Sequence, residues 1–206
     1  MHATLVDLIR RGEPRGGRRY RGNGADDPLS VEGWRQMHAA LGDERPWQQI
    51  VTSPMACCRE LDSELAGRHG LPIAVEHALA EVGLGAREGR THAEVAASEP
   101  AACSASYRDP VRSRPKGGEP LAELSRWVTA AYARQVESHP DRHLLIVCHA
   151  GVMRGPGGTP AGGGARALVS AADRLRRNPA GAPRASRTLS GVRQRPLPPV
   201  IALRRP

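Results

Sequence analysis

Charged and polar residues directly follow three apolar runs of the sequence. Arg10 and Arg11 come after the first run, Ser53 after the second, and His149 after the last, while Glu81 lies in a loop between them. Guanidinium and imidazole groups donate hydrogen bonds that suit the oxygens of phosphates and carboxylates. These residue types therefore predict an anion-binding site, although a lone histidine after an apolar strand is more often a core residue.

The segments around these positions predict a sheet of parallel strands covered by helices. Apolar and β-branched residues indicate strands at Ala3–Ile9, Gln49–Ser53, Ile73–Val75 and Leu144–Cys148. Helices are expected after the capping residue Ser30, from Cys58 to near Gly70, and from Leu121 to Val136 with Pro120 in the first turn. The alternation predicts an α/β fold, a three-layer α/β/α sandwich with a mainly parallel sheet, which binds ligands beyond the carboxyl ends of its strands.

The distribution of charge divides the chain into two unlike parts. The 206 residues carry a formal net charge of +9, with a pI near 10.5. Residues 1–154 hold twenty basic and twenty acidic residues, whereas residues 155–206 hold ten Arg against one Asp, sixteen Gly and Pro, and no aromatic residue. We expect one domain at 1–154 and a separate tail at 155–206 with a composition typical of disorder.

Several classes of protein are not indicated. The cysteines at positions 57, 58, 103 and 148 show no C-x-x-C spacing and no plausible Cys–His cluster, so neither disulfides nor a metal site is expected, and no cofactor is. No leader with a cleavage site is evident, and no run of eighteen apolar residues occurs. We expect a cytoplasmic protein without a membrane partner, and the oligomeric state is not indicated.

A series of short motifs runs through residues 3–154. They are Leu8-Ile9-Arg10-x-Gly12-Glu13-Pro14, Asp27-Pro28-Leu29-Ser30-x-x-Gly33-x-x-Gln36, Thr52-Ser53-Pro54, Glu81-x-x-x-Gly85-x-x-Glu88-Gly89, Gly117-Gly118-Glu119 and Cys148-His149-Ala150-Gly151-Val152. In this order they resemble the histidine phosphatase superfamily, which has the phosphoglycerate-mutase-like fold. The segment from Arg19 to Ser30 is most similar to the branch that includes α-ribazole phosphatases.

The resemblance implies hydrolysis of a small-molecule phosphate ester in two steps. A histidine after the first strand attacks phosphorus, a carboxylic acid protonates the leaving oxygen, and water then releases phosphate. Carried over to this chain, the pattern makes Arg10 a phosphate ligand, Glu81 the proton donor and His149 a second histidine on the phosphoryl oxygens. Glu13 and Glu88 are close enough in sequence to compete for the acid role.

The chain departs from the family's pattern at two positions of the site. Arg11 stands where the nucleophilic histidine is expected, and a guanidinium group stays protonated and has no free lone pair for attack. Cys57 stands where a second phosphate-binding arginine is expected. Together with the loss of expected aromatic residues at Leu84 and Arg87, these changes indicate relaxed selection and an impaired or inactive enzyme.

Neighbouring residues offer only weak substitutes for the missing groups. Cys57 is itself a nucleophile, and Arg10 or Arg11 could lower its pKa, but free cysteines are more often inert packing. Arg59 could replace the lost cation, but two positions further along a helix it faces another direction. We therefore expect Arg59 to be a solvated charge.

The tail departs from the family's pattern as well. Two prolines and six glycines in residues 155–164 prevent the continuing helix that the pattern has, so we hypothesise a reading-frame shift near codon 154. A weak helix is expected from Arg166 to Leu175, and one edge of the sheet is expected to lack a neighbour. Three functions remain open: a phosphatase with residual activity, a non-catalytic binder of phosphate ligands, and an Arg-rich tail on nucleic acid. The last is not favoured, because the tail has no aromatic residue and no Lys.

Overall fold

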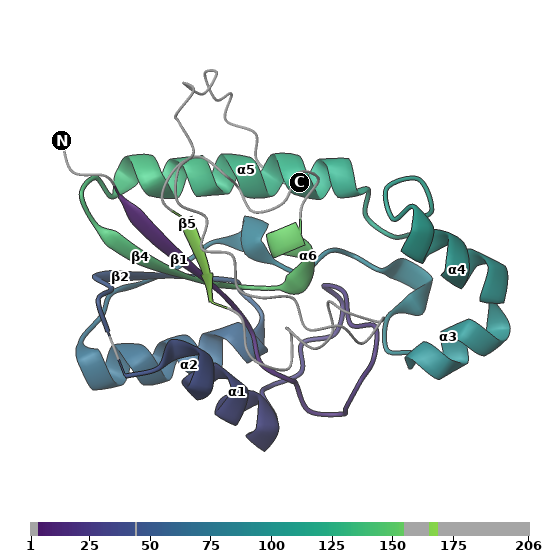
Figure 1. The fold of residues 1–206 in the computed structure, drawn as a ribbon, viewed down its shortest axis with the longest axis horizontal. Coiled ribbons are helices and arrows are strands. Elements are labelled where there is room, and N and C mark those ends of the chain that lie inside the picture. The colour runs from purple at the N-terminus through teal and green to yellow at the C-terminus, as the bar shows by residue number, and fades with distance from the viewer. Residues whose placement is uncertain (1–3, 44, 155–164, 169–206) are drawn as a thin grey trace, which may run out of the picture.

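A five-stranded parallel sheet lies at the centre of the molecule (Figure 1). The computed structural model describes residues 4–43, 45–154 and 165–168. The strands pair in the order β3-β2-β4-β1-β5, with β1 at Leu5–Arg10, β2 at Gln49–Thr52, β3 at Ile73–Val75, β4 at His143–Cys148 and β5 at Ala165–Leu168. Helices lie on both faces, so the predicted α/β sandwich and its first four strands are confirmed.

The last strand, β5, lies in a segment for which the sequence predicts no strand. It pairs in parallel with β1, with Val6 opposite Ala165 and Ile9 opposite Leu168. The expected helix from Arg166 is therefore wrong for residues 166–168, and the side of β1 that faces away from β4 has a neighbour. The predicted boundary at residue 154 falls before the last strand of the sheet, and the other predictions for the tail lie outside the described residues.

One face of the sheet is covered by α1 and α2. Helix α1, Val31–Leu41, begins where Ser30 Oγ accepts a hydrogen bond from the Gly33 amide at 3.0 Å, as the sequence predicts. Helix α2, Ala56–His69, ends at Gly70, whose φ of 64° is the left-handed cap conformation that glycine adopts most easily. These helices pack buried side chains onto the strands, among them Met37, Leu41, Cys58, Leu61 and Leu65 against Ile9, Ile50, Leu145 and Val147.

The opposite face is covered by the long helix α5, Leu121–Ser138 (Figure 1). Leu124, Val128 and Tyr132 recur every four residues and so share one helix face, which packs on the strands. Pro120 is the residue just before the helix, not part of its first turn. The short helix α6, Ala150–Arg154, continues directly from β4 on this side and buries Val152 and Met153.

Two short helices, α3 at His92–Ser98 and α4 at Pro100–Arg108, extend beyond the sheet at the right of Figure 1. They follow 3₁₀ turns at His77–Leu79 and Gly85–Arg87. Neither helix is among the elements expected from the sequence. A capping box starts α3: the Thr91 side chain accepts from the Glu94 amide, and the Glu94 carboxylate accepts from the Thr91 amide at 2.7 Å.

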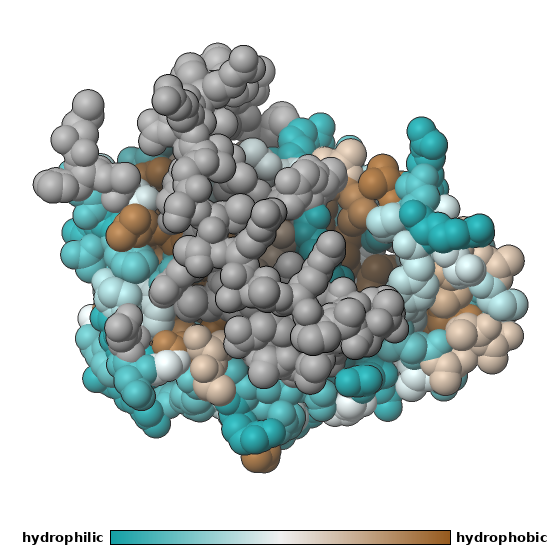
Figure 2. Space-filling model, in the orientation of Figure 1, coloured by the Kyte–Doolittle hydropathy of each residue, from teal (hydrophilic) through white to brown (hydrophobic). Residues whose placement is uncertain are grey.

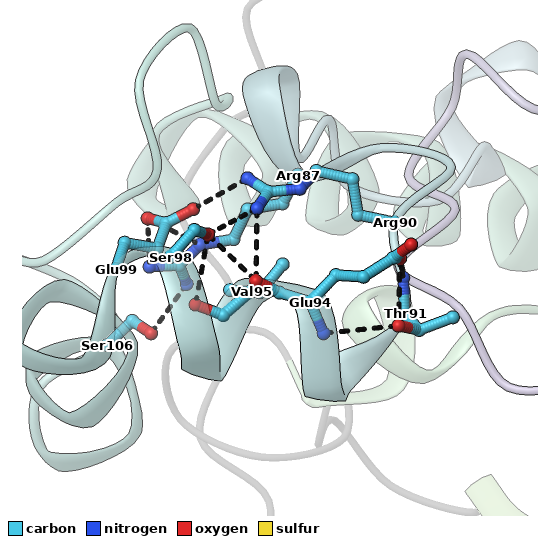
Figure 3. Close-up of polar contacts among 8 residues, drawn as sticks. All are labelled: Arg87, Arg90, Thr91, Glu94, Val95, Ser98, Glu99 and Ser106. Carbon is cyan, nitrogen blue, oxygen red and sulfur yellow. Dashed lines mark hydrogen bonds and ion pairs between the residues drawn. The ribbon is translucent and has the colours of Figure 1, made fainter.

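Arg87 joins these two helices to the preceding turn (Figure 3). Its side chain is 4% exposed, and the guanidinium forms an ion pair with Glu99 at 3.1 Å. It also donates a 2.7 Å hydrogen bond to Ser106 Oγ of α4, and Arg90 binds the other carboxylate oxygen of Glu99 at 3.1 Å. Arg87 is thus a well-partnered structural residue at a position where the resemblance implies an aromatic side chain.

The described surface is mainly hydrophilic on the face shown in Figure 2, where more apolar residues gather toward α3 and α4. Among the described residues, none of the helices combines the length and the apolar character needed to span a membrane.

Candidate functional site

The strand ends bring the predicted site residues to one edge of the sheet. Arg10 is the last residue of β1 and lies opposite Cys148, the last residue of β4. The Arg11 amide donates to the Cys148 carbonyl at 2.9 Å, and the Ser53 amide donates to the Val147 carbonyl at 3.0 Å. Because β4 lies between β1 and β2, the segments that follow these three strands meet, as the sequence predicts.

Close packing against α1 holds the turn that carries Arg11. A Cβ atom on Gly12 would lie 2.1 Å from the Gly33 carbonyl oxygen, and one on Gly33 would lie 2.1 Å from the Glu13 carbonyl oxygen. Only glycine fits at either position without backbone movement. Gln36 adds a side-chain hydrogen bond to the Glu13 amide at 3.0 Å. These contacts explain why both glycines belong to the motifs and why the turn is well positioned.

A cavity of about 500 Å³ opens at this edge of the sheet. Six arginines line it, together with two carboxylates and a group of ring side chains: Arg10, Arg11, Arg18, Arg19, Arg21, Arg154, Glu13, Glu81, Tyr20, His92 and Tyr107. Arg21 is paired with Asp27 at 2.8 Å. The remaining guanidinium groups still outnumber the carboxylates, so the cavity attracts anions.

Glu81 lies in the cavity wall and is tied to α6. One of its carboxylate oxygens accepts hydrogen bonds from the Val82 amide at 3.0 Å and the Gly151 amide at 2.9 Å. Of the two competing carboxylates, Glu13 also lines the cavity. Glu88 does not, because it accepts from the Gly24 and Leu84 amides at 3.0 and 2.7 Å. The structure thus leaves Glu81 and Glu13 as carboxylates that could contact a ligand.

His149 is fully buried beside the cavity and is not among the residues that line it. Its Nε2 atom is 2.8 Å from Ser53 Oγ, whereas its Nδ1 atom has no hydrogen-bond partner. Burial lowers the pKa of His149 to about 3, with the charges of Arg11 and Arg10 adding to the effect. The imidazole is therefore neutral at physiological pH and lies deeper than the sequence predicts for a phosphate ligand.

Cys57 and Cys58 lie in the first turn of α2 and are buried below the cavity. A hydrogen bond from Cys58 is the main cause that lowers the pKa of Cys57, and the charge of Arg11 acts in the same direction. Burial raises the pKa of Cys58 well above its usual value. Arg59 is exposed and does not line the cavity, as expected for a solvated helix charge.

The expectation that the cysteines form no cluster with a histidine is wrong. One ligand atom from each of Cys57, Cys58 and His149 lies within 4.8 Å of the others. The two cysteines are adjacent in the sequence, but about ninety residues separate them from His149. Spacing within a motif cannot reveal such a cluster, which exists because β4 ends beside the start of α2.

Sequence reasoning also missed several residues of the cavity wall. Arg154 comes from α6, while Tyr20, His92 and Tyr107 come from loops and from α3 and α4. The Tyr20 and Tyr107 hydroxyl groups are 2.9 Å apart, and the Tyr107 hydroxyl is 3.3 Å from His92 Nδ1. Their position at the mouth of the cavity depends on α3 and α4, for which no strong periodic pattern exists in the sequence.

Comparison with known proteins shows to which family this chain belongs. A model of the histidine phosphatase superfamily (branch 1) matches residues 6–155. The chain belongs to the histidine phosphatase superfamily. The resemblance seen in the motifs is thus confirmed over the part of the chain that holds the first four strands, the strand-end arginines and the cavity.

This histidine phosphatase superfamily member is similar to two named phosphatases and to a further solved structure. Glucosyl-3-phosphoglycerate phosphatase of Mycobacterium tuberculosis is 31% identical over 166 residues, covering 74% of this chain and 73% of the relative. The structure of Bacillus stearothermophilus YhfR has a TM-score of 0.67 at 30% identity, covering 74% of this chain and 77% of that one. The α-ribazole phosphatase of Shigella flexneri has a TM-score of 0.60 at 27% identity, covering 70% and 73%.

Proposed function

We propose that this chain binds a small phosphate ester in the cationic cavity and that its phosphatase activity is impaired or absent. The observation that carries the proposal is the position of Arg11. Its guanidinium lines the cavity directly after β1, where the resemblance to the family calls for the nucleophilic histidine. Binding needs cationic donors, which the cavity has, whereas transfer to the protein needs a nucleophile.

The imidazole groups near the cavity do not fill the missing role. His149 is buried, and its Nε2 atom is engaged with Ser53. His92 lines the cavity from α3, where its ring lies 4.2 Å from that of Tyr20 and its Nδ1 atom is 3.3 Å from the Tyr107 hydroxyl. The arrangement supports His149 as a neutral residue behind the phosphate site and gives it no route to phosphorus.

Phosphate binding is supported even though Cys57 replaces the second expected arginine. Arg10 and Arg11 are adjacent and both line the cavity, so two guanidinium groups face the place where the equatorial oxygens of a phosphate would bind. In this proposal the position that Arg11 occupies has a binding role in place of the catalytic role that a histidine would have there. Glu81 remains the candidate proton donor, with Glu13 as the alternative.

The number of arginines favours a ligand with a second anionic group. One phosphate dianion is balanced by two guanidinium groups, and Arg18, Arg19 and Arg154 line the same cavity. The named mycobacterial relative is a glucosyl-3-phosphoglycerate phosphatase. We therefore infer that a phosphate ester carrying a carboxylate is bound more tightly than a neutral aryl phosphate.

The test is phosphate release from an aryl phosphate and from a carboxylated phosphate ester. We expect only background release by the natural chain, and a gain of at least about 100-fold in the double variant Arg11→His, Cys57→Arg, because loss of a nucleophile typically costs several orders of magnitude. Acid quenching should trap phosphohistidine in the double variant alone. The matched control, Arg11→Gln with Cys57→Arg, has no nucleophile and should gain nothing.

Turnover by the natural chain at the rate of the double variant would contradict the impaired-enzyme proposal. Binding is measured separately, as the thermal shift that each ester gives with the natural chain and with Arg10→Ala. Loss of the shift in Arg10→Ala is expected. An unchanged thermal shift in Arg10→Ala would show that the ester binds elsewhere and not at the strand ends.

Binding of nucleic acid by the Arg-rich tail is the alternative function, of a different class from phosphate-ester binding. Most of the tail lies outside the described residues, and no described contact favours this function. Steeply salt-dependent DNA binding by the whole chain, lost on removal of the tail, would support it.

A further inference from the structure

Cys57 and Cys58 take no part in the proposed function, yet together with His149 they form a compact group of ligand atoms. The two sulfurs and an imidazole nitrogen all lie within 4.8 Å of one another. Cys57 is 2% exposed, and Cys58 and His149 are 0% exposed. Thiolates and imidazole are the ligands that Zn²⁺ and Cu⁺ prefer.

We propose that Cys57, Cys58 and His149 form a binding site for one thiophilic metal ion, Zn²⁺ or Cu⁺. On binding Zn²⁺, the two thiols release their protons to solvent, two S–Zn bonds and one N–Zn bond form, and no group changes its oxidation state. The site is independent of phosphate-ester binding, since its ligands lie below the cavity wall and its occupancy is measured without a phosphate ester.

The spacing of the ligand atoms suits tetrahedral coordination. Cys58 Sγ and His149 Nε2 are 3.6 Å apart. Bonds of about 2.3 Å to sulfur and 2.0 Å to nitrogen in a tetrahedral zinc site place these two atoms about 3.6 Å apart as well. Ser53 Oγ lies 2.8 Å from the same Nε2 atom. One pair of ligand atoms therefore already has the separation of a tetrahedral site, and the remaining pairs lie within 4.8 Å.

The charges near the cluster are compatible with an added cation. Two thiolates neutralise one Zn²⁺, so the bound site adds no net charge beside Arg10 and Arg11. With Cu⁺ the site carries one negative charge, which these arginines balance. Arg11 is half-buried, and its guanidinium donates a hydrogen bond to the Gly12 carbonyl of its own turn at 3.1 Å.

The test is metal binding by the reduced full-length chain without any phosphate ester. Titration with Cd²⁺, a spectroscopic substitute for Zn²⁺, should give thiolate-to-metal absorption that saturates at one equivalent. Co²⁺ should give the visible spectrum of tetrahedral thiolate coordination in the natural chain, a readout that needs no variant. Competition of Zn²⁺ and Cu⁺ against chromogenic chelators measures their affinities, and binding of either ion supports the proposal.

Variants locate the site. Cys57→Ser, Cys58→Ser and His149→Gln should each weaken binding by at least about 10-fold, in line with the loss of a ligand. Cys103→Ser is the matched control, because Cys103 is also a buried free cysteine but lies on α4. Circular dichroism checks that each variant is folded. Failure of both Zn²⁺ and Cu⁺ to bind the natural chain, or equal weakening in Cys103→Ser, would overturn the proposal.

Discussion

Asp62 and His149 are buried titratable groups whose ionisation affects stability in opposite directions. Burial raises the pKa of Asp62 to about 7, and Thr52 and Arg59 oppose this rise only in part. Between pH 4 and 7 the unfolded chain therefore loses a proton that the folded chain keeps, so stability falls as pH rises. The pKa of His149 is lowered to about 3, so its contribution to stability is lost as pH falls below about 6.5.

Replacing Asp62 by Asn should remove its part of this pH dependence. The stability of Asp62→Asn relative to the natural chain is expected to increase by at most about 4 kcal/mol from pH 4 to pH 7 and then to stay constant, since each pKa unit is worth about 1.4 kcal/mol. Urea unfolding at a series of pH values with a chelator present measures the difference. Asp43→Asn, at an exposed position, is the control and should show no such trend. A flat difference for Asp62→Asn would contradict this assignment.

The site residues that the sequence reveals are those attached to strand ends. Arg10, Arg11 and His149 could be placed together because parallel strands end at the same edge of a sheet. How deep each side chain lies could not be predicted: Arg11 lines the cavity, whereas His149 is buried behind it. That difference depends on the packing of α2 against β4, which no local pattern encodes.

The ion pair between Arg87 and Glu99 determines how α3 and α4 are attached to the domain. Arg87 is 4% and Glu99 28% exposed, and the carboxylate of Glu99 also binds Arg90 (Figure 3). One carboxylate therefore serves two guanidinium groups. Because His92 and Tyr107 of the cavity wall belong to α3 and α4, this network also positions the mouth of the site.

Neutralising Glu99 should destabilise the domain much more than neutralising an exposed partner. Glu99→Gln leaves the Arg87 charge buried without a counter-ion, which we expect to cost about 2 kcal/mol, less than in a fully buried pair because Glu99 is partly exposed. Glu123→Gln removes the exposed pair with Arg126, whose side chains are 49% and 52% exposed, and should cost under about 0.5 kcal/mol. Urea unfolding measures both. Equal costs would show that burial of Arg87 does not matter.

Long elements with clear periodicity were predicted well, and short ones were not. The apolar strands and the four-residue repeat of α5 identify their elements because burial dictates the pattern. Helices α3 and α4 are short and rich in alanine, so their amphipathic pattern is weak. The Thr91-x-x-Glu94 capping box was a readable signal for the start of α3. The strand β5 was missed because it follows a segment rich in glycine and proline.

At the scale of the whole molecule, the sheet depends on a strand beyond the predicted domain boundary. The strand β1 carries Arg10 and Arg11 and lies between β4 and β5. Without β5, its backbone groups on one side would be open to pairing with other chains. The family match ends at residue 155, so this strand is part of the folded sheet that lies outside the matched region.

Truncation tests whether the domain ends before or after β5. A chain ending at residue 154 should be less stable than one ending at residue 168, by roughly 1–3 kcal/mol for four strand residues with their ladder hydrogen bonds, and should aggregate at lower concentration. Urea unfolding and light scattering of the two chains and of the full-length chain check both expectations. The chain ending at 168 is the matched control, because it lacks most of the tail and keeps β5. If the two truncated chains are equally stable, β1 needs no neighbour on this side and the domain is complete at residue 154. If only the chain ending at residue 168 is as stable as the full-length chain, β5 is part of the domain that holds the strand-end arginines in place.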